Sequence, residues 1–288
     1  MSAKSTVLVL GATGMLGSAV LRFFAQSPGH SVIGSARCFD AARLLPDSLR
    51  GQIIGGIDVQ DMDGLLRLFE RVAPDVVINC VGLVKQLAGG NDPLTALPVN
   101  SMFPHRLLGL CKVAGSRLIH ISTDCVFDGA KGMYGESDSA DARDMYGLSK
   151  YLGEVHDSPA ITLRTSIIGP ELNSAHGLLG WFLAQRSETK GFTRAIFSGL
   201  PTVELARIIR DFVIPKPDMN GLFHVSAAPI SKHDLLLLIA REYGKSIAVV
   251  PDGTLVIDRS LDSTRFREHT SYVPPSWPQL VRSMREFG

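Results

Sequence analysis

The chain has 288 residues, 45% of them hydrophobic, and its 29 Lys and Arg nearly balance its 28 Asp and Glu, for a formal charge of +1. This length suffices for one large domain or two unequal ones with a sizeable core. The composition excludes a disordered or collagen-like chain. The balanced charge gives no broad field for nucleic acid, so no nucleic-acid partner is expected.

The first residues of the chain and its longest apolar run bear on the cellular compartment of the protein. Residues 1–6 are polar and lead directly into an apolar strand, without the apolar region and cleavage site of a signal peptide. The densest apolar run, residues 235–240, is far shorter than the ~20 residues of a membrane-spanning helix. We therefore expect a cytoplasmic protein with no membrane partner. The cysteines lack the paired spacing of a zinc site, and we expect free thiols and no metal. They are Cys38, Cys80, Cys111 and Cys125.

Short β-branched runs alternate with segments of helical period through the first half of the chain. Strands are expected at residues 6–10, 31–36, 52–54, 75–79, 117–122 and 160–165. Helices are expected at residues 18–25, 62–72, 104–114 and 146–156. This alternation is typical of right-handed βαβ units around a parallel sheet. The predicted fold class is therefore α/β, a doubly wound parallel sheet.

The alternation decays beyond residue 169, which predicts a smaller C-terminal lobe. A helix at 203–213, a strand at 222–226 and a helix at 232–243 are expected there, with Ser231 as the N-cap of the last helix. We assign residues 1–168 to the doubly wound domain, with 198–230 returning to it. Residues 169–197 and 231–288 are assigned to a substrate-binding lobe.

A glycine-rich turn follows the first expected strand and opens a helix. Glycine permits a tight turn, a close approach of a pyrophosphate, and close packing of the helix on the strand. The helix N-terminus then presents free N–H groups to the phosphates. This context indicates a dinucleotide-binding domain of the Rossmann type. The candidate cofactor-binding residues of the turn are Gly11, Thr13, Gly14, Met15, Leu16 and Gly17.

The second and third strands bear on the choice of cofactor. Where a carboxylate would bind the adenosine 2′-hydroxyl, the chain has Arg37, whose guanidinium suits a 2′-phosphate. NADP (NADPH) is therefore favoured over NAD. A solvated loop position for Arg37 is the alternative, because Asp40 lies close by. Asp58, followed by Val59, is expected either to reach the adenine or to cap the helix that follows.

Tyr146 and Lys150 are four residues apart on an expected helix, so both face the same side. A cation at that distance lowers the pKa of a phenol, ordinarily near 10, and makes it a more useful acid. Thr123 stands at the carboxyl end of the fifth strand, on the edge where open α/β sheets bind ligands. Three features occur in this order along the chain: the glycine turn, Thr123 and the Tyr-x-x-x-Lys pair. Their joint occurrence is far less likely by chance than any one of them alone.

With these motifs the sequence resembles the extended short-chain dehydrogenase/reductases, and more narrowly their dTDP-4-dehydrorhamnose reductase branch. The resemblance rests on residues 74–80, 99–100, 122–129, 146–150, 163–166 and 199–202. It implies that Thr123, Tyr146 and Lys150 form the catalytic set. It also implies reduction of a keto sugar linked to a nucleotide diphosphate, with NADPH or NADH as the hydride donor.

Further candidates follow the strands of the predicted sheet. For the cofactor they are Cys80, Val81 and Gly82 after the fourth strand. For the substrate they are Lys85, Asn100, Cys125 and Arg164. For Arg164, a role in bridging the two lobes is an equal explanation. The histidines at 105, 120, 156 and 224 have no nearby carboxylate or cysteine cluster and are expected to be structural or exposed.

Two positions depart from the reductase pattern. Cys125 stands where that branch usually has tyrosine; the related dehydratases have glutamate there, and the epimerase/reductases that make GDP-fucose have cysteine. We expect Cys125 to be a packing residue, because nothing nearby in sequence except Lys150 supplies a positive charge to stabilise a thiolate; an acid/base role is the alternative. The loop at residues 82–86 also differs, which bears on the identity of the sugar.

The expected function is NADPH-dependent reduction of a keto group, at C4 of a nucleotide-diphosphate 6-deoxy sugar, in polysaccharide precursor synthesis. The expected partners are the nucleotide sugar and a second copy of the chain in a homodimer. A nucleotide-sugar epimerase or epimerase/reductase is one alternative. A non-catalytic NADP-binding regulatory subunit is another, because the regulatory subunit of methionine adenosyltransferase resembles the same branch.

Overall fold

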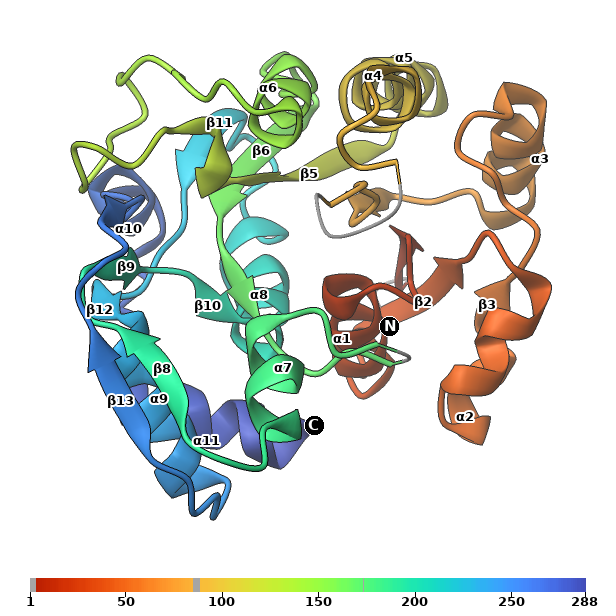
Figure 1. Ribbon diagram of the computed structural model, residues 1–288. Coiled ribbons are helices and arrows are strands. Elements are labelled where there is room, and N and C mark those ends of the chain that lie inside the picture. The colour runs from red at the N-terminus through yellow and green to blue at the C-terminus, as the bar shows by residue number, and fades with distance from the viewer. Residues whose placement is uncertain (1–3, 85–88, 173) are drawn as a thin grey trace.

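The computed structural model describes residues 4–84, 89–172 and 174–288. Seven strands, all paired in parallel, form the central sheet in the order β11-β6-β5-β4-β1-β2-β3 (Figure 1). They are β1 Ser5–Leu10, β2 His30–Ser35, β3 Ile53–Ile54, β4 Val76–Asn79, β5 Arg117–Thr123, β6 Ala160–Thr165 and β11 Gly221–His224. The predicted α/β fold with a doubly wound parallel sheet is confirmed.

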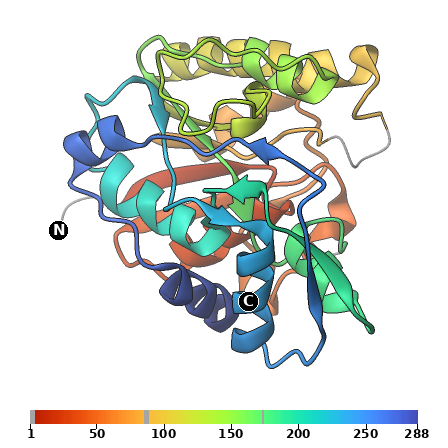
Figure 2. The ribbon, with the colours of Figure 1, turned by 60° about the vertical axis from the view of Figure 1, so that its left-hand side comes forward.

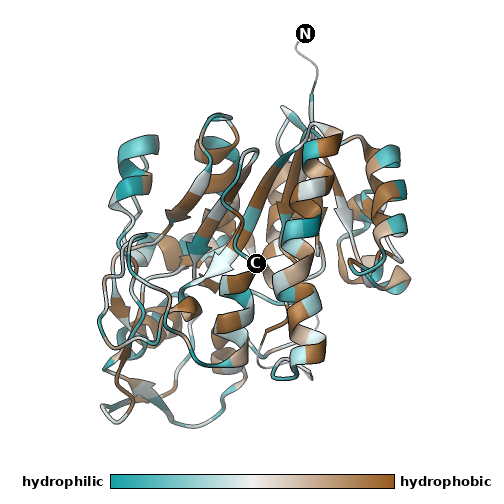
Figure 3. Ribbon diagram, turned by 90° about the horizontal axis from the view of Figure 1, so that it is seen from above, coloured by the Kyte–Doolittle hydropathy of each residue, from teal (hydrophilic) through white to brown (hydrophobic). Residues whose placement is uncertain are grey.

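The sheet is apolar on both faces because helices cover both (Figure 3). Alternate residues of β1 belong to the hydrophobic clusters on opposite faces of the sheet. Val7 and Val9 belong to one hydrophobic cluster, whereas Leu8 and Leu10 belong to the other. Residues 7–10 of this strand are therefore buried between two layers of helices.

Each helical layer is drawn from distant parts of the chain. One layer contains α1 Met15–Ala25, α8 Thr202–Ile208 with its π-helical extension η4 Ile209–Val213, and α11 Trp277–Phe287. The other contains α3 Met62–Val72 and α5 Phe103–Ala114, with α4 Pro93–Ala96, the π-helix η2 Leu97–Met102 and α6 Met145–Leu152 on the same side of the sheet (Figure 1). Short helical turns η1 Phe39–Leu44, α2 Asp47–Arg50 and η3 Asp124–Val126 occupy connections.

The smaller lobe is built from short strands and helices of the second half of the chain. Its elements are α7 Leu178–Ala184, β8 Thr189–Phe192, β9 Ala195–Phe197, β12 Ile230–Ser231, α9 Lys232–Glu242, β13 Val249–Asp252, β14 Ile257–Asp258 and α10 Thr264–Thr270. Strands β8 and β13 form a two-stranded ribbon beside α9 (Figure 2), and β9 lies between β12 and β14. Strand β7 Ile167–Ile168 pairs with β10 Leu200–Pro201 where the chain leaves the central sheet.

Most expected elements are present, with one clear error at the end of a helix. The helix expected at 146–156 ends at Leu152. A Cβ on Gly153 would overlap the backbone carbonyl of Asn100, so the chain turns there against η2. Ser231 caps α9 as predicted, accepting a 3.0 Å hydrogen bond from the Asp234 N–H. Strand β11 returns to the central sheet beside β6; the domain bounds themselves stay a prediction.

Further expectations concern thiols, metals and membranes. The four cysteines are free thiols. Among the described residues no cluster of three metal-ligating side chains occurs. Within the same part of the chain, no helix has the length and apolar character needed to cross a membrane.

Candidate active site

The glycine turn between β1 and α1 has the geometry of an anion-binding site. Gly11 has a φ of +76°, which a residue with a side chain rarely adopts. A Cβ on Gly17 would overlap the carbonyl oxygen of Gly11, so α1 can approach the turn only with glycine there. Gly14 is the N-cap of α1 and supplies no side chain to the first-turn N–H groups. These features fit the diphosphate of a dinucleotide.

A cleft of about 580 Å³ extends from this turn across the carboxyl ends of the strands. Its walls include eleven of the residues that the sequence singled out. They are Thr13, Gly14, Met15, Leu16, Cys80, Val81, Gly82, Thr123, Cys125, Tyr146 and Lys150. Gly11 and Gly17 shape the turn behind the wall. The sequence motifs, scattered over 140 residues, therefore meet at one site.

The candidate catalytic residues reach the cleft from β5 and α6. Asp144 caps α6 through a 2.9 Å hydrogen bond from the Gly147 N–H. A Cβ on Gly147 would overlap the carbonyl oxygen of Cys125, so glycine lets α6 pack closely on the end of β5. This contact brings Tyr146 to the Thr123 hydroxyl, and the two side chains are hydrogen-bonded.

Lys150 is buried and held behind the cleft. Its Nζ donates a 2.7 Å hydrogen bond to the carbonyl oxygen of Ile121. Burial lowers the pKa of this ammonium to about 8, while Glu154 and Cys80 oppose the shift. The side chain therefore remains mostly protonated at pH 7.

The expectation that Tyr146 has a lowered pKa is wrong for this structure. Burial raises the pKa of the phenol above its usual value, and the acidic groups of Cys125, Asp124 and Asp144 add to the rise. The Thr123 hydrogen bond acts in the opposite direction. The prediction from sequence considered only the positive charge of Lys150 on α6. It did not include the burial of the phenol or the nearby acidic groups. Tyr146 thus holds its proton at neutral pH.

Cys125 lies in the wall of the cleft and is half-buried. Arg259, from the loop after β14, places Nη1 3.6 Å from the Cys125 Sγ and donates from Nε to the carbonyl oxygen of Phe127 at 2.7 Å. A cation distant in sequence therefore lies beside this thiol, whereas the expectation of a packing role considered only cations nearby in sequence. No sequence signal linked residues 125 and 259, because they are 134 positions apart.

Asp124 and Lys232 also line the cleft and were not predicted as site residues. Asp124 is buried, and burial raises its pKa, while the positive charge of Arg259 partly offsets the rise. Thr123 Oγ1 lies 3.2 Å from the Asp124 Oδ1, so the carboxylate also orients the candidate catalytic hydroxyl. The Thr123-Asp124 pair in sequence was a usable signal for this contact.

Two substrate candidates lie behind the wall. The Asn100 side chain donates to the Leu83 carbonyl at 2.9 Å and accepts from the Leu83 N–H at 2.8 Å, which fixes the loop after β4. Arg164 is 3% exposed and forms a two-pronged ion pair with the 1% exposed Glu154, with both N···O distances 2.7 Å. Neither side chain is part of the cleft wall, so both act on the site through neighbours. Lys85 lies outside the described residues.

The adenosine-side candidates lie on the same edge but outside the cleft wall. Arg37 follows β2 and is exposed. Asp58 accepts a 2.9 Å hydrogen bond from the Gln60 N–H, and Val59 stands between them. The helix cap is Asp61, which accepts from the Gly64 N–H at 3.0 Å, so the capping alternative for Asp58 is wrong.

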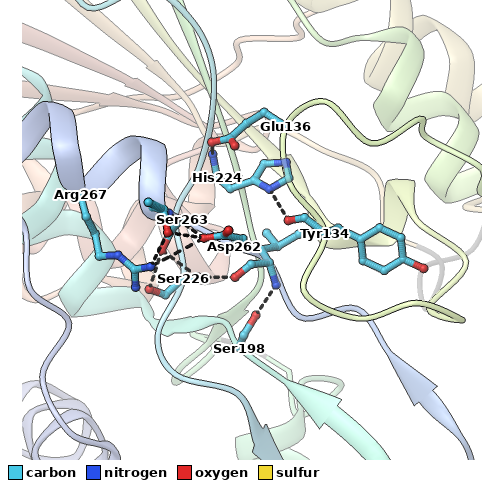
Figure 4. Close-up of polar contacts among 10 residues, drawn as sticks. Tyr134, Glu136, Ser198, His224, Ser226, Asp262, Ser263 and Arg267 are labelled. Carbon is cyan, nitrogen blue, oxygen red and sulfur yellow. Dashed lines mark hydrogen bonds and ion pairs between the residues drawn. The ribbon is translucent and has the colours of Figure 1, made fainter.

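A polar network joins the smaller lobe to the central sheet (Figure 4). His224 on β11 donates from Nδ1 to the Tyr134 carbonyl at 2.9 Å, and its Nε2 accepts from Arg164 Nη1 at 3.3 Å. Ser226 Oγ donates to the Leu261 carbonyl at 2.8 Å. This joint fixes the segment that carries Arg259 into the cleft. His224 is structural, as expected.

The RmlD substrate binding domain family matches residues 5–254. The chain belongs to this family. Membership confirms the predicted family and, with it, the predicted enzyme class, an NAD(P)-dependent oxidoreductase.

Individual relatives cover different shares of the chain. A Haloferax volcanii protein named "Probable low-salt glycan biosynthesis reductase" is 32% identical over 178 residues, 60% of this chain and 57% of that protein. The chain thus matches little more than half the length of that reductase. The beta subunit of methionine adenosyltransferase 2 from Rattus norvegicus is 31% identical over 81% of this chain and 71% of the subunit.

Among solved structures, dTDP-4-dehydrorhamnose reductase from Bacillus anthracis in complex with NADP superposes with a TM-score of 0.80. It is 19% identical, and the match covers 99% of this chain and 100% of that one. This likeness confirms the Rossmann-type fold. That structure contains NADP, the cofactor predicted from this sequence.

Proposed function

We propose that this protein uses NADPH to reduce a keto group, at C4, of a nucleotide-diphosphate 6-deoxy sugar. The observation that carries the proposal is the convergence of Thr123, Tyr146 and Lys150 in one cleft with the glycine turn. The names of the reductase relatives support the same class of substrate.

The side chains account for the proton that the reduction needs. NADPH, when bound, supplies a hydride to the carbonyl carbon. Tyr146 donates its proton to the carbonyl oxygen, and Thr123 hydrogen-bonds the same oxygen. The raised pKa of Tyr146 keeps the phenol protonated until the more basic alkoxide develops. Lys150 holds the nicotinamide ribose. A positioned general acid such as Tyr146 contributes about 10²- to 10⁴-fold to the rate.

The smaller lobe supplies the cations for the nucleotide diphosphate. Lys232 at the start of α9 and Arg259 after β14 line the cleft together with Asp124 and Tyr146. Guanidinium and ammonium groups are the side chains that pair best with phosphate oxygens. A sugar held between these cations and the glycine turn would present its ring to Tyr146.

The proposal is tested with a panel of keto sugars linked to dTDP, UDP, GDP or CDP. Each is mixed with the protein and NADPH while the absorbance of the reduced nicotinamide is followed. Loss of absorbance with one keto sugar, and not with the matching hydroxy sugar, supports the proposal. No loss with any member of the panel overturns it.

Two alternative functions each have an observation in their favour. The cleft position of Cys125 beside Arg259 favours an epimerase/reductase, in which the thiol moves a proton at a ring carbon. The similarity to the methionine adenosyltransferase subunit favours a regulatory role. A regulatory subunit would bind NADP(H) but would not turn over any keto sugar, so the panel separates it from the reductase.

We also propose a cytoplasmic role in polysaccharide precursor synthesis, and a homodimer. Neighbouring helices η2 and α6 expose Met102, Leu148, Tyr151 and Leu152, each between 39% and 54%. Such an apolar group on adjacent helices suits a second copy of the chain. Light scattering at rising protein concentration would show a mass of twice 31.1 kDa.

A further inference from the structure

Two buried polar side chains lie next to each other on neighbouring strands, behind the cleft wall. Asn79 on β4 and His120 on β5 are paired in register, and each is 0% exposed. The Asn79 Nδ2 is 3.1 Å from the His120 Nδ1. The mechanism proposed above uses neither residue.

Hydrogen bonding fixes the orientation of both side chains. The Val81 N–H lies 3.1 Å from the Asn79 Oδ1, and because a backbone N–H only donates, the amide oxygen must face it. The Asn79 Nδ2 then faces His120 as a donor. The His120 Nδ1 is therefore the acceptor, and its proton resides on Nε2.

This pair holds the first turn of the loop that faces the cofactor. Cys80, Val81 and Gly82 all line the cleft. A Cβ on Gly11 would lie 3.2 Å from the Val81 nitrogen, so this backbone packs directly against the glycine turn. A shift of the Val81 backbone would therefore displace the wall on which a dinucleotide lies.

The His120 ring is not explained by stability alone. Its Nε2 is buried and has no hydrogen-bond partner among the described residues. An unpaired buried donor costs stability, so an apolar side chain would be favoured here if packing were the only demand. Burial, together with Lys150, His105 and His156, lowers the pKa of His120 well below its usual value. The ring thus stays neutral and keeps Nδ1 available as an acceptor.

We propose that His120 is a positioning residue for the dinucleotide. Its Nδ1 orients the Asn79 amide, which holds the Val81 backbone where the loop after β4 meets the cofactor. The inference rests on the proposed function only in taking NADP(H) as the ligand; it does not depend on the identity of the sugar.

The test compares substitutions at residue 120 in the full-length protein. His120→Phe keeps a ring and removes the acceptor, whereas His120→Gln keeps an acceptor. NADPH affinity is measured by fluorescence titration and stability by thermal unfolding. The rate of hydrogen exchange of the Val81 amide is measured relative to that of the Ile78 amide. Thr162→Val is the matched control. Thr162 is buried on β6 in register with His120, and it hydrogen-bonds the Val155 carbonyl, away from the cofactor loop.

His120→Phe is expected to weaken NADPH binding about tenfold and to accelerate exchange at Val81 more than at Ile78. His120→Gln should restore both to within about threefold of wild type, and Thr162→Val should lower the melting temperature while leaving NADPH affinity unchanged. If His120→Phe does not fold, His120→Leu takes its place. Unchanged NADPH affinity and Val81 exchange in the Phe or Leu variant would overturn the inference. A wild-type protein that binds NADPH but reduces no keto sugar would contradict the proposed function and leave this inference intact.

Discussion

At the scale of single residues, the site depends on environments that the sequence does not display. The spacing of Tyr146 and Lys150 was visible in the sequence. The burial that raises the pKa of Tyr146 and lowers that of Lys150 comes from packing of α6 against η2, η3 and β5. Arg259 shows the same limit. It reaches Cys125 from a loop 134 positions away in sequence, which its own bond to the Phe127 carbonyl and the neighbouring Ser226–Leu261 bond hold in place.

The exposed guanidinium of Arg37 is expected to select the cofactor. Arg37→Ala should reduce affinity for NADPH about tenfold or more and leave NADH affinity nearly unchanged, because only NADPH carries the 2′-phosphate. Isothermal titration of both cofactors provides the measurement. Arg43→Ala is the control, since Arg43 is an exposed arginine nearby that is paired with Asp40 at 3.3 Å. Equal affinities of the wild-type protein for the two cofactors would refute the assignment.

Cys125 is expected not to move a ring proton if the protein is a simple reductase. In deuterated water, the wild-type product should then carry no deuterium on its ring carbons, and Cys125→Ser should give the same product. Mass spectrometry and NMR of the product provide the measurement. Deuterium that enters a ring carbon with the wild type and disappears with Cys125→Ser would assign the protein to the epimerase/reductases.

At the scale of elements, sequence periodicity predicted the strands better than the ends of helices. The β-branched runs gave all seven strands of the central sheet within about two residues, because strands buried on both faces are continuously apolar. The end of α6 was missed because it is set by contact between Gly153 and Asn100, which are 53 positions apart in sequence. The same bend places Glu154 beside Arg164. Arg164, which was a candidate for binding the substrate, therefore joins β6 to the chain after α6.

Loss of this buried ion pair should destabilise the protein strongly. Arg164→Met leaves the Glu154 carboxylate buried and without its guanidinium, which typically costs about 3–5 kcal/mol. Urea denaturation provides the measurement. Lys131→Met is the control, because the side chains of the Lys131–Asp138 pair are 57% and 28% exposed, and surface pairs contribute about 0–1 kcal/mol. Similar losses in the two variants would contradict the structural role assigned to Arg164.

At the scale of the whole molecule, a histidine that must stay neutral lies at the joint between the lobes, where its Nδ1 and the Asp262 N–H of the smaller lobe both donate to the Tyr134 carbonyl. Burial first, and then the nearby Arg164, lower the pKa of His224 to about 4 from a usual value near 6.5. The unfolded chain therefore binds more protons than the folded one between these two values. The stability that neutral His224 contributes is fully present above about pH 6.5 and falls as the pH drops toward 4.

This linkage predicts acid sensitivity that is centred on the lobe joint. Between pH 7 and pH 4, the free energy of unfolding should fall by about 3 kcal/mol from His224 alone, with His120 contributing in the same direction. Urea denaturation at a series of pH values provides the measurement. His224→Gln should flatten the curve over this range. An equally steep curve in that variant would show that other groups control the acid transition.

The proposed reduction depends on Tyr146 acting as the proton donor in a cofactor-binding cleft. The most direct measurement is NADPH oxidation by Tyr146→Phe with the keto sugar that the wild type reduces, together with its NADPH affinity; Tyr151→Phe, a half-exposed tyrosine on the same helix, is the control. We expect the rate to fall about 10²- to 10⁴-fold in Tyr146→Phe, with NADPH affinity within about twofold of wild type and no change in Tyr151→Phe. Full turnover by Tyr146→Phe would contradict the assignment of Tyr146 as the proton donor.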